Sequence, residues 1–165
     1  MVKQLKVMAC AAAFAATTFV PATLLHADLQ ADEKGFARMQ LGDENWEEYP
    51  GIPGVSRMTV YGDLSKAGIY VIRVRFSPGI MSMPHFHPED RMVTVVKGIW
   101  WTGTGENFDP AKTEPIRTGG FMLHPAGGAH FDGAKDEEVI LQMAGMGPSG
   151  TTFYKPELGR TGKSQ

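Results

Sequence analysis

Four of the five histidines in this 165-residue sequence lie between residues 85 and 130, and they are the side chains best suited to chemistry. His85 and His87 are two residues apart, so on a β-strand both imidazoles point to the same face and can bind one ion. His130 follows the turn sequence PAGGA and is favoured as the third ligand over His124, which directly precedes proline. Three imidazoles with open positions around the ion are typical of a catalytic metal site.

Short strands must position these histidines. The sequence has β-branched and aromatic runs separated by glycine and proline, such as GIYVIRVRF, RMVTVVKGIWW and EEVILQMAG, and we find no long helical pattern and no repeat. In IYVIRVRF, alternation places Tyr70, Ile72, Val74 and Phe76 on one face. Regular short strands with turn signals predict an all-β barrel or sandwich.

The N-terminal residues 1–27 are predicted to be a signal peptide, because two lysines precede an apolar run from Val7 to Val20 that is followed by Pro21 and Ala27. We therefore expect a periplasmic or secreted protein. Cleavage would remove the one cysteine, Cys10, and with it any disulfide. The formal net charge of −2 and the absence of a basic patch argue against nucleic acid as a partner. We expect no membrane contact after cleavage.

The rest of the chain has the length of one domain. We predict an N-terminal arm over residues 28–57, a barrel over 58–155 and a mobile tail over 156–165.

The histidines stand in two motifs that resemble those of the cupin superfamily. The first is GIMSMPHFHPEDRMVTVVKG and the second is GGFMLHPAGGAH. The matching positions are Gly79, His85, His87, Gly98, Gly119, Pro125, Gly127 and His130. The resemblance covers roughly residues 58 to 146. It implies a cupin-type antiparallel β-barrel (jelly roll, or double-stranded β-helix), often dimeric, with a metal held by the motif histidines.

Two positions depart from the cupin pattern: Arg91 replaces the motif glutamate, and Ala134 replaces the motif asparagine. If the strand continues in register from His87, the guanidinium points into the barrel, and like charges close to a dication are costly. Three arrangements would relieve this cost. Arg91 pairs with Glu89, Asp90 or another acid; Arg91 holds the carboxylate or another anionic group of a substrate; or the metal is absent.

Two residues are candidates to replace the missing carboxylate ligand. Glu89 follows His87 by two residues, although the intervening Pro88 disturbs the strand. His124 is the other candidate, as a fourth ligand or as an acid/base outside the ligand shell. The sequence leaves both open.

We therefore predict a secreted, metal-dependent enzyme with a small-molecule substrate, anionic or aromatic in character. Its ion is divalent: Fe²⁺ is the first choice, and Mn²⁺, Ni²⁺, Zn²⁺ and Cu²⁺ share the spacing. Three-histidine cupin centres without the glutamate resemble those of thiol dioxygenases and of some diketone-cleaving dioxygenases, which makes dioxygenation the leading chemistry. Arg91 would orient the substrate and His124 would move a proton, while Trp100 and Trp101 either line a pocket or pack in the core. The alternative is a non-catalytic sensor module that binds metal or ligand.

Overall fold

The computed structural model describes residues 29 and 31–164. The predicted signal peptide, residues 1–27, lies outside the described residues. Apart from two short 3-10 helices at Pro110–Lys112 and Pro156–Leu158, all regular secondary structure of the described chain is β-strand. The strands are β1 (Glu47–Glu48), β2 (Val55–Tyr61), β3 (Gly68–Phe76), β4 (Ile80–Ser82), β5 (His85–Phe86), β6 (Arg91–Lys97), β7 (Ile99–Thr104), β8 (Glu114–Arg117), β9 (Phe121–His124), β10 (His130–Gly133), β11 (Val139–Gly147), β12 (Thr152–Phe153) and β13 (Thr161–Lys163). Neither helix is long and apolar enough to cross a membrane.

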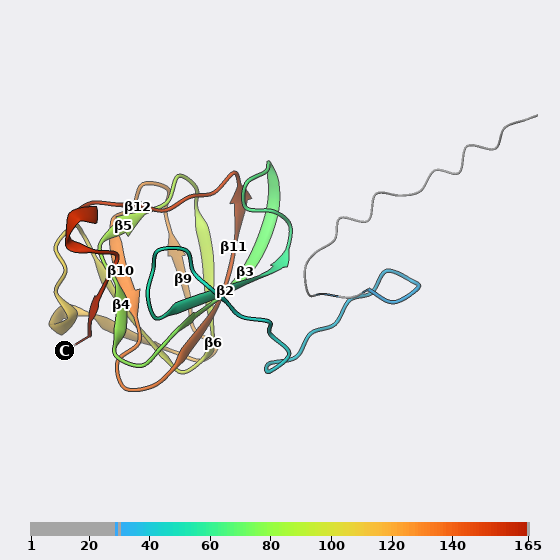
Figure 1. The fold of residues 1–165 in the computed structure, drawn as a ribbon, viewed down its shortest axis with the longest axis horizontal. Helices are drawn as coiled ribbons and strands as arrows, with labels where there is room; N and C mark the ends of the chain where they lie inside the picture. The colour runs from blue at the N-terminus through green and yellow to red at the C-terminus, as the bar shows by residue number, and fades with distance from the viewer. Residues whose placement is uncertain (1–28, 30, 165) are drawn as a thin grey trace, which may run out of the picture.

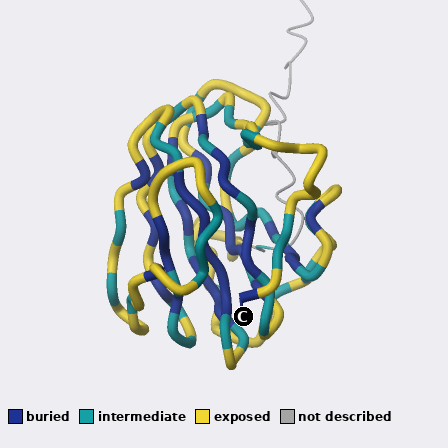
Figure 2. Tube along the Cα trace, turned by 90° about the vertical axis from the view of Figure 1, so that its left-hand side faces the viewer, coloured by how far each residue is buried: buried dark blue, intermediate teal, exposed yellow. Residues whose placement is uncertain are grey.

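The strands form two antiparallel sheets that face each other (Figure 1). One sheet has the order β1-β2-β3-β11-β6-β9. The other has the order β12-β5-β10-β4-β13, with β7 paired to β10 and β8 paired to β7. Buried residues run along the strands while the connecting turns are exposed (Figure 2). The predicted all-β antiparallel barrel is therefore confirmed.

Strand β3 shows how the alternation builds the core. Tyr70, Ile72, Val74 and Phe76 are all at most 4% exposed and belong to the main apolar cluster. The intervening arginines point to the outer face, where Arg73 forms an ion pair with Glu44 of the N-terminal arm. The arm thus covers part of the outer surface of this sheet.

The turn glycine Gly98 is required by geometry. Its φ is +83°, and a Cβ there would lie 2.5 Å from the carbonyl oxygen of Glu138. Only glycine takes this conformation without strain. The glycine of the first motif therefore sets the tight turn between β6 and β7.

The two ends of the barrel differ from the predicted boundaries. Strand β2 starts at Val55, three residues before the predicted start of the barrel at 58. Residues 161–163, expected in a mobile tail, form β13 and pair with β4. This strand is polar, so its sequence carries no strand pattern. Gly162 lets it pack closely, because a Cβ at that position would lie 2.7 Å from the ring of Phe108.

Candidate metal centre

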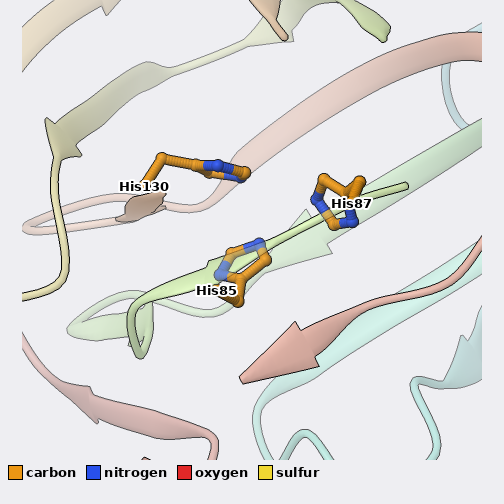
Figure 3. Close-up of side chains that lie close together, drawn as sticks. All are labelled: His85, His87 and His130. Atoms are coloured by element: carbon orange, nitrogen blue, oxygen red, sulfur yellow. The ribbon is translucent and has the colours of Figure 1, made fainter. Parts of the chain in front are cut away.

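His85, His87 and His130 converge inside the barrel (Figure 3). His85 in β5 is the antiparallel partner of His130 in β10, and His87 follows β5 directly. The three ring centroids are 4.3 to 5.1 Å apart, and the ligand atoms all lie within 4.8 Å of one another. All three side chains are buried. The triad is positioned to hold a metal ion.

Backbone carbonyls orient the three rings. The Nδ1 atoms of His85, His87 and His130 lie 2.8, 2.8 and 2.9 Å from the carbonyl oxygens of residues 83, 150 and 128. A carbonyl only accepts hydrogen bonds, so each Nδ1 carries the proton and donates it. Each Nε2 is left with a lone pair, which is the form that binds a metal.

The burial of the histidines fits a resident cation. The Nε2 of His130 is buried and finds no hydrogen-bond partner in the described part of the chain, which is costly unless another group binds it. Burial lowers the pKa of His85 to about 3 and that of His124 to about 2, and it also lowers the pKa of His87. The rings of His85, His87 and His124 are therefore neutral near pH 7. The free Nε2 lone pairs of the triad fit a divalent ion.

Arg91 lies beside the triad and does not swing out to solvent. Its side chain is 3% exposed, its Nε donates to Glu89 at 2.9 Å, and its Nη1 lies 3.3 Å from the Nε2 of His87. Its Nη2 donates to the hydroxyl of Ser149 and, at 3.2 Å, to the carbonyl of Gly150. Of the three arrangements that the sequence leaves open, the ion pair with Glu89 is present, and it coexists with contact to His87.

Glu89 is held away from the histidines. Its Oε1 accepts hydrogen bonds from Tyr70 at 2.7 Å, from Ser149 and from Arg91. Burial works against the charged form, but these three hydrogen bonds together lower the pKa of Glu89. Glu89 is not a member of either possible ligand group among the described residues. The carboxylate neutralises Arg91 in place of joining the triad.

His124, at the end of β9, lies next to the triad. Its ring centroid is 3.8 Å from that of His130, the residue is 2% exposed, and neither ring nitrogen has a hydrogen-bond partner in the described chain. The ring of Trp100 lies 5.5 Å away. His124 thus offers two free nitrogens close to the third ligand.

Asp132 completes this group and was missed by the sequence analysis. His124, His130 and Asp132 form a second set that could hold an ion. The Oδ1 of Asp132 accepts a hydrogen bond from Ser82 at 2.9 Å, and burial raises the pKa of this carboxyl group. A signal existed: Asp132 is two residues after His130, so strand alternation places both on the same face.

A small cavity of about 40 Å³ opens beside the histidines. This volume has room for one or a few waters. Its apolar wall is made by Tyr49, Ile52, Val55, Val74, Phe76, Met143 and Phe153. Trp100 and Trp101 are absent from this wall, and Trp100 packs in the core with 0% exposure. The core-packing interpretation of Trp100 therefore holds.

A larger open cleft of about 870 Å³ lies next to this cavity. Tyr49 and Arg91 line both spaces, so these two side chains stand between the cleft and the metal centre. Arg57 lies on the cleft side, with its guanidinium carbon 4.9 Å from the centre of the Tyr49 ring.

Comparison with known proteins gives matches in structure alone. No protein-family model and no curated protein matches the sequence. The polyketide cyclase RemF from Streptomyces resistomycificus matches with a TM-score of 0.57 and 17% identity, over 74% of this chain and 93% of that one. A cupin-2 domain from Rhodospirillum rubrum matches with a TM-score of 0.52 and 16% identity, over 65% of this chain and 70% of that one.

This chain has the cupin fold. A further match is the DMSP lyase DddQ from Ruegeria pomeroyi, with a TM-score of 0.56 and 15% identity, over 68% of this chain and 62% of that one. The cupin resemblance of the two sequence motifs is thereby confirmed at the level of the fold. In this cupin barrel the histidines of both motifs meet at one point, as their spacing predicts.

Proposed function

We propose that this cupin-fold protein is a metal-dependent enzyme acting on a small organic substrate. The observation that carries the proposal is the set of three buried imidazoles, His85, His87 and His130, whose Nδ1 atoms are all fixed by backbone carbonyls. A divalent ion held there would supply a Lewis acid with open positions next to the small cavity. Fe²⁺ is our first choice of ion.

Arg91 is the residue proposed to orient the substrate. Its guanidinium borders both the small cavity and the open cleft, so an anionic group that enters from the cleft meets it on the way to the histidines. Its planar fork suits a carboxylate. Since Nη1 lies 3.3 Å from His87, binding such a group would exchange one contact of Arg91 for another.

His124 is the residue proposed to move a proton. Its ring is buried beside His130 and both nitrogens are without hydrogen bonds in the described residues. Because burial lowers its pKa to about 2, the ring would hold a proton from the substrate only briefly and pass it on. The aromatic side chains of Tyr49, Phe76 and Phe153 give the cavity an apolar wall. The cavity itself has room only for water-sized groups, so the apolar or aromatic body of the substrate would lie in the larger cleft, which Tyr49 and Arg91 also line.

Dioxygenation is the leading reaction. Elimination and cyclisation are rivals that would use the same residues, and two of the structural neighbours are a DMSP lyase and a polyketide cyclase. The periplasmic or secreted location and the homodimer stay predictions, which cell fractionation and light scattering of the purified protein would test.

The test begins with the protein purified without a histidine tag. We expect one divalent ion per chain by elemental analysis, lost in His130→Ala, and oxygen uptake with members of a panel of small carboxylates. Arg91→Lys, which keeps the charge but loses the fork, should raise KM for carboxylates much more than it lowers metal content. A metal-free wild type would refute the proposal. Bound metal without turnover on any carboxylate would favour the non-catalytic sensor module instead.

A further inference from the structure

The free ligand atoms in this barrel are not those of the motif triad alone. The Nε2 of His87 accepts a hydrogen bond from Arg91 at 3.3 Å, so this triad nitrogen is engaged. The ring nitrogens that are buried and lack partners in the described chain are Nε2 of His130 and both nitrogens of His124. The unsatisfied nitrogens therefore belong to residues of β9 and β10.

Asp132 supplies the negative charge at this place. It is 2% exposed, and its Oδ2 lies 3.9 Å from the Nε2 of His124. Two atoms that each lie about 2.1 Å from one ion are at most about 4.2 Å apart, so this pair can bind the same ion without rearrangement. The ligand atoms of His124, His130 and Asp132 are all within 4.8 Å of one another, so small side-chain shifts would complete the set.

The charge of Asp132 lacks a resident cationic partner. Within residues 29 and 31–164, no lysine or arginine forms a salt bridge with it, and the basic side chain nearest to its Oδ2 is His124, at 3.9 Å. A buried carboxylate is costly unless it is paired or binds a metal. Ser82 satisfies one oxygen only, through its hydroxyl.

We propose that His124, His130 and Asp132 form a second metal-ligand set, an alternative to the triad for the same single ion, because the one free lone pair of His130 can bind only one ion at a time. The set provides the carboxylate that the first motif lacks at Arg91. The inference rests on the proposed function only in requiring that the barrel binds a divalent ion. Two imidazoles and one carboxylate are the set typical of non-haem iron enzymes, and oxygen ligands also favour Mn²⁺. The carboxylate also halves the charge of the bound dication in a site that already holds Arg91.

In this arrangement His124 would be a metal ligand and would not be the residue that accepts a proton from the substrate. The ion bound by His124, His130 and Asp132 leaves His87 in contact with Arg91, as the structure has it. Arg91 then keeps its ion pair with Glu89 while the cavity side of the ion stays open.

The test compares the tag-free wild type with Asp132→Asn, His124→Gln and Ser82→Ala. Binding of Mn²⁺ and Zn²⁺ is measured on the chelator-treated proteins, by the EPR signal of free Mn²⁺ and by competition with a chromogenic zinc chelator. Loss of a residue that only orients a ligand costs about 10–100-fold in metal affinity, so we expect loss of a ligand in Asp132→Asn or His124→Gln to weaken Mn²⁺ binding by more than about 100-fold. Ser82→Ala is the matched control: it touches the carboxylate but offers no ligand, so its effect on affinity should be smaller.

The outcomes separate this inference from the proposed function. Wild-type Mn²⁺ and Zn²⁺ affinity in both Asp132→Asn and His124→Gln would overturn the second set and leave the triad intact. A wild type that binds neither ion would overturn both. The chelator-treated Asp132→Asn protein should be at least as stable as the wild type in urea, because a buried charge is removed; if it nevertheless fails to fold, His124→Gln decides.

Discussion

Replacing Glu89 with glutamine should destabilise the protein far more than loss of a surface ion pair. Glutamine has the same shape and keeps an acceptor for Tyr70, but it leaves the guanidinium of Arg91 buried without an anion. The Glu89 and Arg91 side chains are 12% and 3% exposed and lie 2.9 Å apart. Removing one partner of such a pair costs about 3–5 kcal/mol. Because the amide of glutamine keeps part of the hydrogen bonding, we expect Glu89→Gln to lower the free energy of unfolding by about 3 kcal/mol, the lower end of this range.

The assay is urea unfolding of the chelator-treated protein, so that metal binding does not contribute. The matched control is Glu138→Gln: the Lys97–Glu138 pair is also short, at 3.0 Å, but its side chains are 51% and 36% exposed. Such an exposed pair contributes about 0–1 kcal/mol. The double variant Glu89→Leu with Arg91→Met removes both charges and should be more stable than Glu89→Gln. Equal losses for Glu89→Gln and Glu138→Gln would refute the idea that the pair neutralises a buried cation.

Three further predictions concern the barrel interior. In the metal-free protein, burial lowers the pKa of His85 to about 3 and that of His124 to about 2. The free energy of unfolding should therefore be fully present above pH 6.5 and should fall below pH 6.5 by up to about 1.4 kcal/mol per pH unit for each ring. Equal urea midpoints at pH 7 and pH 4.5 would contradict this. Cu²⁺ should quench the fluorescence of Trp100, because its ring is 5.5 Å from that of His124, and Trp100→Phe should remove most of the quenching. Wild-type fluorescence that does not change when Cu²⁺ is added would place the ion elsewhere. Gly145→Ala should lower the free energy of unfolding by about 1–3 kcal/mol, because the new Cβ would lie 2.5 Å from the hydroxyl of Tyr70. Thermal melting measures this loss. A melting temperature equal to that of the wild type would show that Tyr70 moves aside freely.

The fold and the triad were accessible from the sequence because both depend on local patterns. Strand alternation is visible within β3, and the spacing of His85 and His87 is the same alternation applied to ligands. Gly98 is required at a tight turn because its φ is +83°, and this part of the requirement is local to the chain.

The surroundings of the triad were not accessible, because they depend on residues far apart in the chain. Alternation from His130 indicates which face Asp132 is on, but its hydrogen bond depends on Ser82, fifty residues earlier in the chain. Ser149 contacts Arg91 across 58 positions from a loop that carries no pattern. The local sequence suggested that Arg91 pairs with Glu89, but only the folded barrel shows that Arg91 also contacts the ring of His87.

The carbonyl groups that hold the three imidazoles have a consequence for variation of this protein. Carbonyls 83, 128 and 150 belong to the main chain, so no single side-chain replacement can delete them. Random mutagenesis can therefore replace a ligand histidine, but it cannot change the direction in which the main-chain carbonyl orients the ring at that position. Changing that direction requires an insertion or deletion in the flanking loops, so a library that varies loop length around residue 150 would reshape the centre more than one that varies residue identity.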